Sequence, residues 1–488
     1  MTVIPTAPGR RTVLRPVALF GAALISLQIL WVLALPAFFG MDEFDHAYRA
    51  TSVADGHWGP GTEIPGDGRG FLIRVPDDIV AAAHDACSAL KYTGRDNCTA
   101  VTGSETGGSV LVASGAATYN PVWYAVVGTV AKPFSGTTAL FVMRLTNILL
   151  CDLMLLLAAA LTLRGRCSSW PFLGVVLAAA PTLIYATSVA APNGLCYASG
   201  VLLWAAGLQL ARDSEADPRG PLFAVGAAGA VVMVTHTTGV LWVGLAAACI
   251  APVLWPTVRR LARQRPRALF GTGLALALVA VACTAWVVLA NTNDPNADNV
   301  HAGPMPGEMF ISGPLLWTLQ AVATLRFRDT PAPIPVYGLA MALLVVLLMA
   351  AVRAADRRIR ITLLLLAVLV NVVPLALTYL TYDALGSVWQ GRYTLPLSVG
   401  FVLVITHTLS RGEVAPWIRW TLVATMTAMH ALTVRSAFPA SRSGYLHDPV
   451  ALLLVGVAVY LLAVSAAARE AALVVRTIPR TASHVEHA

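Results

Sequence analysis

Long apolar runs separated by short polar connectors dominate the sequence. Most of these runs are long enough to cross a bilayer as an α-helix, for which about 20 apolar residues suffice. The pattern predicts about twelve membrane spans, at Leu14–Phe39, Thr137–Leu163, Phe172–Val189, Leu195–Leu210, Leu222–Val234, Val240–Leu254, Ala268–Leu289, Val336–Val352, Ile361–Tyr379, Leu395–Leu409, Trp420–Val434 and Val450–Ala468. We therefore expect an all-α polytopic membrane protein with a single transmembrane domain over residues 1–488.

Composition excludes other classes of protein. Hydrophobic residues make up 57% of the chain, charged residues only 12%, and the mean hydropathy is +0.70, which excludes a soluble globule and a disordered chain. The formal net charge of +8 would by itself suggest a nucleic-acid partner. However, the basic residues are nearly all Arg and lie in short groups between apolar runs, so we expect no such partner.

The distribution of Arg predicts the orientation in the membrane. With the N-terminus in the cytoplasm, the termini and alternate connectors carry 21 Arg against 7 acidic residues. The connectors on the other side carry 11 Lys and Arg against 17 acidic residues. By the positive-inside rule we expect both termini in the cytoplasm. The first apolar run lacks a convincing cleavage site, so we expect it to remain as an anchor.

This orientation puts the long connectors outside the cytoplasm. Residues 40–136 are far more than a turn needs, so we expect an extracytoplasmic subdomain there, and a second long loop over residues 291–330. Each contains a short apolar stretch, Asn120–Pro133 and Phe310–Leu325, that suits an interfacial helix, or in the second loop a re-entrant one. A short true span at Asn120–Pro133 is the alternative, but it would abolish the Arg asymmetry.

The placement of cysteines predicts one disulfide. Cys87 and Cys98 lie in the first long connector, an oxidising location in this orientation, at a separation that permits a bond. A zinc site is less favoured because no Cys-x-x-Cys pair exists and only His84 is near. The other five cysteines lie in or beside spans, where Cys usually acts as a small apolar filler: Cys151, Cys167, Cys196, Cys249 and Cys283.

Three carboxylates and a histidine gather where the chain leaves the first span, in the stretch Met41-Asp42-Glu43-Phe44-Asp45-His46-Ala47-Tyr48-Arg49. A carboxylate just outside the membrane can deprotonate an acceptor hydroxyl as it attacks an activated sugar carbon, so Asp42 or Glu43 is a candidate general base. A lipid-linked substrate would keep its tail in the bilayer. The alternative is that these acids cap the span or begin a surface helix.

A phosphate leaving group needs a cation beside it. Arg392, in Trp389-Gln390-Gly391-Arg392-Tyr393, is predicted at the outer end of the tenth span, and Arg144 near the outer end of the second. Both can reach the height of Asp42, and an Arg fork binds phosphate through two hydrogen bonds. Snorkelling or a structural ion pair is the alternative for each.

Three further polar residues lie in or beside spans. His236, in a predicted outer turn, is a candidate substrate contact. His46 follows Asp42 by four residues and would share its helix face, a spacing that can bind a metal, but the sequence offers no further ligand set. Asp152 falls in the middle of a span, so we expect it to be protonated or paired in a structural role.

Five short motifs occur in a fixed order: Asp42-Glu43-x-x-His46-x-Tyr48-Arg49, Asn120-Pro121-x-x-Tyr124, Arg144-Leu145, Pro192-Asn193-Gly194-Leu195 and Gly391-Arg392-Tyr393. With this set the chain resembles, over nearly its whole length, a widespread bacterial family of membrane proteins of unknown function. That family is similar to the GT-C superfamily of integral membrane glycosyltransferases, which includes protein O-mannosyltransferases, aminoarabinose transferases and actinobacterial arabinofuranosyltransferases.

The resemblance implies a GT-C-like bundle in the bacterial plasma membrane with an extracytoplasmic active site. It implies inverting transfer of a hexosyl or pentosyl group from a polyprenyl-phosphate donor to a cell-envelope glycan, lipid or protein. Asp42 would be the general base, Glu43 would orient the acceptor or a water, and Arg392 would hold the donor phosphate. Nine further residues from these motifs and their surroundings are candidate substrate contacts: Asp45, His46, Arg49, Tyr124, Arg144, Asn193, His236, Gln390 and Tyr393.

One departure from the family pattern bears on metal use. Many relatives carry an acidic residue in the third-to-fourth turn, where this chain has Asn193. We therefore expect metal-independent chemistry without a cofactor. Fold-level analogy does not fix the sugar.

Two other functions fit a polytopic membrane protein. A transporter or flippase of lipid-linked envelope precursors would carry charges along a path through the bundle and often inverted repeats, whereas here only Asp152 is deep. A polymerase or ligase that uses a lipid-diphosphate-linked glycan would need more outer-face Arg than this chain supplies. The sequence favours the glycosyltransferase.

Overall fold

The computed structural model describes residues 10–62, 70–89, 98–99, 108–164, 168–212, 217–292, 303–325, 330–387, 389–438 and 449–476. Within these residues the regular secondary structure is helical apart from two small antiparallel sheets and one isolated bridge between Thr62 and Leu72. One sheet pairs β1 (Phe71–Pro76) with β2 (Ser109–Ser114), and the other pairs β3 (Thr324–Leu325) with β4 (Thr330–Pro331). The prediction of an all-α polytopic membrane protein is confirmed.

Each predicted span coincides with a helix or, in one case, with a bent pair of helices. In the described part of the chain, eight of these helices are long and apolar enough to cross a membrane, and a ninth span results if the bent pair is counted. The eight are α1 (Arg10–Ala34), α5 (Gly136–Leu163), α8 (Pro192–Arg212), α10 (Gly239–Gln264), α11 (Pro266–Leu289), α13 (Ile334–Ala354), α14 (Arg357–Leu385) and α17 (Pro449–Arg476).

The other three predicted spans lie on helices that are short or more polar. α9 (Arg219–Thr235) has 17 residues and α15 (Leu395–Leu409) has 15, which is less than the roughly 20 residues a perpendicular span needs. α16 (Pro416–Ala437) carries charged residues in its first and last turns. The predicted count of about twelve is therefore larger than the eight or nine helices that meet the criterion on their own.

Proline accounts for two departures from the predicted boundaries. The run Phe172–Val189 is a bent pair, α6 (Trp170–Ala178) and α7 (Pro181–Thr187), whose axes differ by 66°. Pro181 has no N–H and its ring clashes with the preceding turn, so α6 stops before it. Likewise, α1 ends at Ala34 because Pro36 disfavours a helical Leu35, although the apolar run continues to Phe39.

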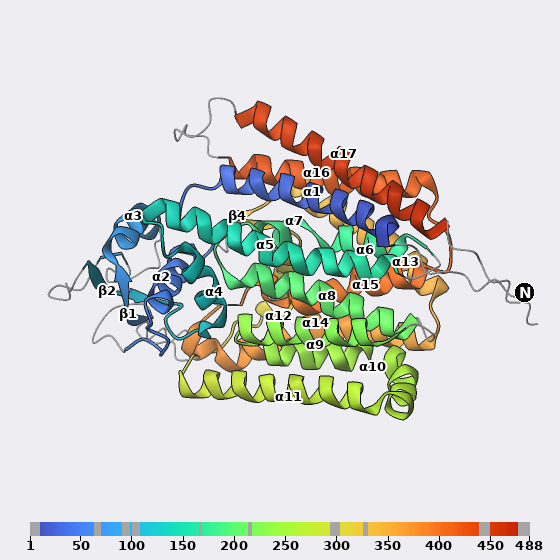
Figure 1. Ribbon diagram of the computed structural model, residues 1–488, viewed down its shortest axis with the longest axis horizontal. Coiled ribbons are helices and arrows are strands. Elements are labelled where there is room, and N and C mark those ends of the chain that lie inside the picture. Colours follow the sequence, from blue (N-terminus) through green and yellow to red (C-terminus); the bar gives the residue numbers. More distant parts are fainter. Residues whose placement is uncertain are drawn as a thin grey trace, which may run out of the picture.

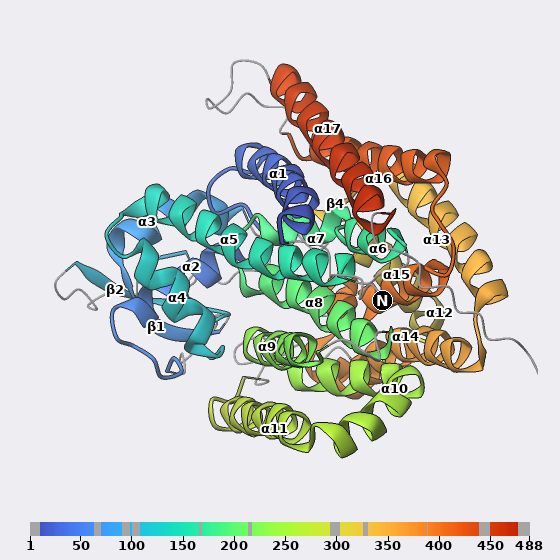
Figure 2. The same ribbon diagram turned by 45° about the vertical axis from the view of Figure 1, so that its right-hand side comes forward.

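The core of the bundle surrounds α8. In the most apolar 18-residue stretch of α8, 89% of the residues are buried. The helix packs against α5, α9, α10 and α15. At the edge, α11 contacts mainly α9 and is only 6% buried by the same measure, and α17 covers α1 on another edge (Figures 1 and 2). The apolar side chains exposed on these outer helices are the surface that a bilayer would cover.

The Arg-rich connectors meet at one end of the bundle. Arg15 pairs with Glu470 at 3.4 Å, which joins the start of α1 to the end of α17. The connector before α14 and the one after α15 are joined by the Arg411–Asp356 pair at 3.6 Å. The elements between α1 and α5 lie at the opposite end (Figure 1). The separation of charge predicted from the sequence thus corresponds to the two ends of one bundle.

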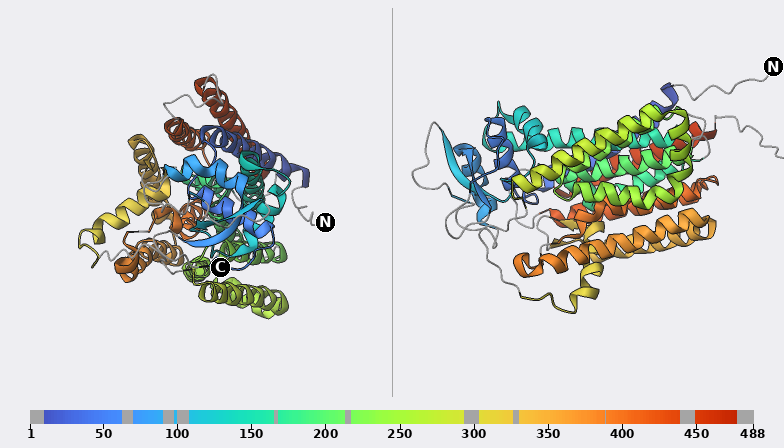
Figure 3. Two further views of the ribbon diagram at one scale, coloured as in Figure 1. Left: turned by 90° about the vertical axis from the view of Figure 1, so that its left-hand side faces the viewer. Right: turned by 90° about the horizontal axis from the view of Figure 1, so that it is seen from below.

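The segment between α1 and α5 forms a subdomain that covers the end of the bundle (Figure 3). It contains α2 (Glu43–Ala54), α3 (Asp77–Ser88), the β1–β2 sheet and α4 (Pro121–Ala131). Phe71 pairs with Ser114 and Pro76 with Ser109 in that sheet. A disulfide joins Cys87 at the end of α3 to Cys98, with the two Cα atoms 5.4 Å apart. These elements are joined to the bundle by α5, which packs against α3 and α4.

Both apolar stretches assigned to the membrane interface are short helices, α4 and α12 (Met309–Val322). On α4 the side chains of Val122, Val126 and Val130 are about half exposed and recur every four residues, so they form one stripe. The opposite face packs on α2. We infer that this stripe rests in the lipid interface.

Four of the five predicted filler cysteines are free and buried, and Cys167 lies outside the described residues.

We predict that the end bearing the subdomain faces the outside of the cell. Gly307, before α12, and Arg263, near the end of α10, are both exposed but lie in connectors of opposite predicted sides. In intact cells, a membrane-impermeant maleimide should label Gly307→Cys and should label Arg263→Cys only after permeabilisation, with the unmodified chain as background. The reverse pattern would overturn the orientation.

Candidate active site

The turn between α1 and α2 brings the first acidic residues into place. Asp42 is the residue before α2 and has a left-handed backbone with φ of 52°, a conformation that Asp and Asn tolerate better than most residues. Gly40 must be small, because a Cβ atom there would lie 2.8 Å from the Glu43 carboxylate and 2.9 Å from Val189. The turn therefore points the neighbouring side chains of Asp42 and Glu43 in different directions.

Glu43 forms a buried ion pair with Arg144 of α5. Nε and Nη2 of Arg144 donate to the two carboxylate oxygens at 2.8 and 2.7 Å, and both side chains have no exposed surface. Glu43 also accepts from the backbone N–H of Gly40 at 3.1 Å and of Ala190 at 2.9 Å. Arg144 also donates to the carbonyls of Val32, Leu35 and Pro36, at 3.4, 3.1 and 2.9 Å.

This pair corrects two predicted roles. Every N–H of Arg144 has an acceptor inside the protein, so no donor remains for a substrate phosphate. Both oxygens of Glu43 already accept two hydrogen bonds each, so the carboxylate cannot also orient an acceptor or a water. The structural ion pair left open as an alternative for Arg144 is the arrangement that the structure has.

Asp45 and His46 hold the subdomain together. Asp45 accepts from the backbone N–H of Gly115 at 2.7 Å, which ties α2 to the end of β2. His46 Nδ1 lies 2.8 Å from the hydroxyl of Tyr124 on α4. Burial raises the pKa of Tyr124 well above its ordinary value, so its phenol stays protonated. These buried contacts differ from the predicted role of all three residues at the substrate.

Arg49 fills the interior of the same subdomain. Its guanidinium donates to four backbone carbonyls, those of His57, Trp58, Gly59 and Tyr119. Burial lowers the pKa of Arg49 to about 10, which still leaves it charged at neutral pH. A cation that holds four carbonyls fixes the loop after α2, so its predicted contact with substrate is also replaced by a structural role.

Asp42 and Arg392 meet at the end of the bundle, although 350 positions separate them in the sequence. Arg392 Nη2 donates to Asp42 Oδ2 at 3.1 Å, and the side chains are 3% and 23% exposed. Asp42 is the one carboxylate of the Asp42, Glu43 and Asp45 cluster that is not buried. The structure therefore brings together the two residues predicted to act as base and as phosphate ligand.

The loop that carries Arg392 is fixed by α12. The 3₁₀ turn Gly391–Thr394 begins against this helix, where a Cβ atom on Gly391 would clash with the carbonyl of Trp317. The N–H of Gly391 also donates to Gln320 Oε1 at 2.8 Å. Burial alone would lower the pKa of Arg392, but the phenol of Tyr393 and the carboxylate of Asp42 outweigh it and raise the pKa. Arg392 is thus a permanent cation in a fixed place.

Aromatic rings surround this cation. The guanidinium of Arg392 lies 5.1 Å from the ring centre of Tyr393. Tyr393 contacts His236 and Trp389 at centroid distances of 5.5 and 5.7 Å, and Trp389 contacts Trp242 at 6.1 Å. Sequence reasoning did not select Trp242 or Trp389 as site residues, although Trp389 stands within the Arg392 motif.

His236 is held in its neutral form. Its Nδ1 accepts from the backbone N–H of Thr238 at 3.2 Å, so the ring proton of the neutral form lies on Nε2. Burial, and secondarily Arg392, lower the pKa of His236 to about 4. His236 is therefore a hydrogen-bond donor and not a cation at neutral pH.

Several buried polar atoms of the site have no hydrogen-bond partner among the described residues. They are Nε and Nη1 of Arg392, Oε1 of Gln390 and Nε1 of Trp389. Buried polar groups are normally paired, so unpaired donors and acceptors gathered around one cation indicate a place where a polar ligand completes the pairing.

Asn193 lies at the start of α8, partly exposed, and its side chain forms no hydrogen bond with the described residues. Within those residues no cluster of three or more His, Cys, Asp or Glu side chains can hold a metal ion.

Comparison with known proteins identifies the family. Residues 25–401 match DUF2142, a family described as predicted membrane proteins. The chain belongs to this family. The resemblance seen in the ordered motifs of the sequence is thereby confirmed. All the site residues described above lie within the part that matches DUF2142.

Two solved structures are similar to this DUF2142 chain. They are crystal structures of ArnT from Cupriavidus metallidurans, one bound to undecaprenyl phosphate and one in the apo state. Each is 15% identical with a TM-score of 0.45, and each match covers 94% of this chain and 76% or 75% of the ArnT chain. No curated protein matches the sequence.

We predict that the Glu43–Arg144 pair stabilises the fold. Glu43→Gln keeps the shape of the side chain but leaves the charge of Arg144 buried without a counter-ion, which typically costs about 3–5 kcal/mol. Urea unfolding of the purified protein in detergent measures the loss.

Lys132→Gln is the matched control, because it breaks the exposed Lys132–Asp55 pair, which is 3.1 Å long. An exposed pair contributes about 1 kcal/mol or less. Equal effects of the two substitutions would refute the structural role of Glu43.

Proposed function

We propose that this protein is an integral membrane glycosyltransferase that moves a hexosyl or pentosyl group from a polyprenyl-phosphate donor to a cell-envelope acceptor. The observation that carries this proposal is the Asp42–Arg392 pair, in which a partly exposed carboxylate lies 3.1 Å from a buried guanidinium. The pair lies at the end of the bundle away from the Arg-rich connectors, so the reaction takes place on the extracytoplasmic side of the plasma membrane.

The two residues match the two places where charge changes during glycosyl transfer. The acceptor oxygen attacks the anomeric carbon and gives its proton to the carboxylate of Asp42. The bond from that carbon to the phosphate oxygen breaks, and the leaving polyprenyl phosphate takes the electron pair. Arg392 stabilises the charge that develops on this phosphate. One displacement inverts the configuration at the anomeric carbon, and no metal or cofactor takes part.

Donor binding must open the Asp42–Arg392 pair. In a single displacement the base and the leaving group lie on opposite faces of the sugar, so the sugar enters between the two side chains. The phosphate then replaces Asp42 as the anion at Arg392, and Nε and Nη1, which have no partner among the described residues, complete its binding. Asp42 loses its counter-ion at the same moment, which makes the carboxylate a stronger base.

Neighbouring residues suit the sugar. The neutral His236, with its proton on Nε2, can donate to a sugar hydroxyl, and Gln390 Oε1 can accept from one. The aromatic faces of Tyr393 and Trp389 offer an apolar wall for the C–H face of the ring or for the first prenyl unit. Asn193, at the start of α8, stays a predicted substrate contact.

A transporter of lipid-linked precursors fits the structure less well. The deep acidic residue, Asp152, accepts from Gln28 Nε2 at 2.8 Å, and the same amide donates to Thr187 at 3.1 Å. This buried network joins α1, α5 and α7 and is consistent with the structural role predicted for Asp152. Four of the buried polar atoms that lack a partner among the described residues belong to Trp389, Gln390 and Arg392, at the end that carries Asp42.

We predict that Asp42→Asn lowers turnover about 10² to 10⁴-fold while donor binding survives, because the amide keeps the shape but cannot take the proton. Asn also tolerates the left-handed backbone at this position. The assay measures sugar transfer by the purified protein from a panel of polyprenyl-phosphate sugars. Asp55→Asn, at the other end of α2, is the control and should transfer normally. Near-native transfer by Asp42→Asn would remove Asp42 as the base.

We predict that Arg392→Lys weakens donor binding and slows turnover together, since Lys retains the charge but loses the two-pronged fork. The measurement separates KM for the donor from kcat over a range of donor concentrations. Arg435→Lys, an exposed position in the last turn of α16, is the control. An unchanged KM with reduced kcat would argue against a phosphate contact in the ground state.

A further inference from the structure

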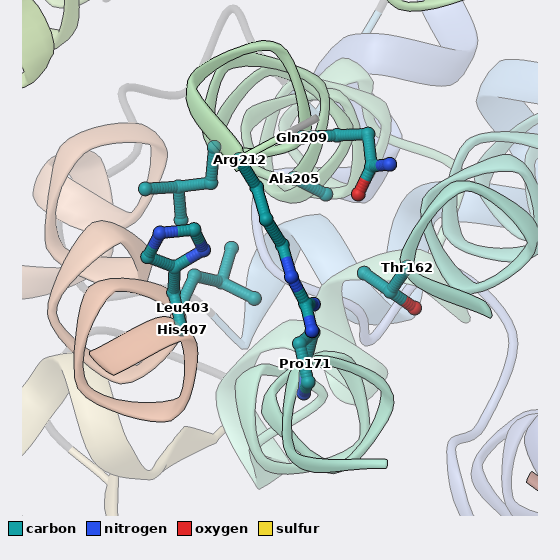
Figure 4. Close-up of a pocket in the computed structure, with 8 residues that line it drawn as sticks. Thr162, Pro171, Ala205, Gln209, Arg212, Leu403 and His407 are labelled. Atoms are coloured by element: carbon teal, nitrogen blue, oxygen red, sulfur yellow. The ribbon is translucent and has the colours of Figure 1, made fainter. Parts of the chain in front are cut away.

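A second polar site lies at the other end of the bundle. It is a pocket between the last turns of α5, α8 and α15 and the first turn of α6, with an empty volume of about 270 Å³ that includes its open mouth. Its polar lining comes from Thr162, Gln209, Arg212 and His407 (Figure 4). The Asp42–Arg392 pair belongs to the opposite end, so this pocket is not part of the proposed active site.

Arg212 extends across this pocket, with His407 on one side and Gln209 and Thr162 on the other (Figure 4). Its terminal nitrogens, Nη1 and Nη2, are buried, and among the described residues neither has a hydrogen-bond acceptor. Buried guanidinium nitrogens without an acceptor are unfavourable, because they lose their hydration and gain no hydrogen bond in return. An anion that fills the pocket would remove this cost.

The surroundings select the kind of anion. Thr162 uses its hydroxyl to donate to the carbonyl of Ala159 at 2.8 Å, so the side chains left to contact a ligand are Gln209, Arg212 and His407. Among the described residues that line the pocket, Arg212 is the one that carries a permanent charge. A guanidinium fork beside amide and imidazole donors suits the oxygens of a phosphate group.

The position of the pocket suits a lipid as the source of that phosphate. The pocket lies at the Arg-rich end of the bundle, where α5, α8 and α15 end and α6 begins, and we expect this end to lie at the depth of the lipid headgroups of the nearer leaflet. Basic pockets between helix ends bind the headgroups of anionic lipids.

We propose that this pocket is a phosphate-binding site at the Arg-rich end of the protein, with Arg212 as its main ligand. The phosphate comes from an anionic lipid of that leaflet or from free phosphate, since the two share the chemistry that the pocket recognises. This site is independent of glycosyl transfer, and its test measures binding only. Its failure would leave the proposed function untouched.

The experiment uses the full-length protein in detergent, depleted of lipid and phosphate. Three probes are added separately: inorganic phosphate, dioleoyl phosphatidylglycerol, and dioleoylglycerol, which has the same tails without the phosphate. Native mass spectrometry counts retained lipid, and the apparent melting temperature reports both kinds of ligand. We expect phosphatidylglycerol, but not dioleoylglycerol, to be retained and to raise the melting temperature.

Variants test the assignment to Arg212. Arg212→Gln should weaken phosphatidylglycerol binding roughly tenfold or more, because a charge-assisted contact is lost. Arg219→Gln is the matched control, since Arg219 is exposed at the same end of the bundle. Ala205→Leu fills the pocket but keeps Arg212, so it should also abolish binding, and it preserves the test if Arg212→Gln does not fold.

The outcomes distinguish the two sources. Stabilisation by both phosphate and phosphatidylglycerol supports a site for the phosphate group itself, and stabilisation by the lipid alone supports a headgroup site that also needs the tails. Equal retention of dioleoylglycerol, binding that survives both substitutions, or no response to any probe would overturn the proposal.

Discussion

The buried Glu43–Arg144 pair is the constraint on which the rest of this end of the molecule depends. Arg144 gathers three carbonyls from the end of α1 and the carboxylate at the start of α2, while Glu43 also holds the turn before α8 through Ala190. Three stretches of the chain that are distant in sequence, residues 32–43, Arg144 and Ala190, thus converge on one pair of charges. In an environment of low dielectric constant, loss of any one partner leaves a charge unpaired, so the convergence is all or none.

That pair also decides which acidic residue remains available for chemistry. Asp42 and Glu43 are neighbours in sequence, and both precede a helix. Because the backbone at Asp42 is left-handed and Glu43 is drawn inward, only Asp42 reaches the side where Arg392 lies. Glu43, whose role is structural, therefore positions Asp42, the proposed general base. The cost of the unusual backbone at Asp42 is small beside that of breaking the buried pair.

The sequence predicted the features that depend on composition and on the positions of apolar and basic residues along the chain. Apolar runs located the helices and the excess of Arg separated the two ends. The predicted positions of Asp42 and Arg392 at the outer ends of two spans placed both residues at one height, although 350 positions separate them. The bend between α6 and α7 had a signal, since Pro181 stands inside a predicted span.

The roles of Arg49 and Arg144 had no such signal. An Arg that binds backbone carbonyls and one that binds a phosphate use the same N–H donors, and only the three-dimensional positions of the acceptors distinguish the two cases. For the same reason the sequence could not separate a substrate-facing Asp45 or His46 from the buried residues that the structure shows.

The valine stripe on α4 has a consequence for the lipids in which this protein works. α4 packs directly on α2, and Asp42 is the residue that precedes α2, so the depth at which the stripe settles sets the height of the Asp42 carboxylate above the hydrocarbon. A bilayer whose thickness differs from the apolar length of the bundle forces the helices to tilt or the lipid to deform. Because α4 packs on α5 as well as on α2, and Arg144 of α5 holds Glu43 beside Asp42, α4 and the Asp42 turn follow the bundle as it tilts. Acyl-chain length thereby becomes a variable that acts on how deep the Asp42–Arg392 pair lies in the membrane interface without touching either residue.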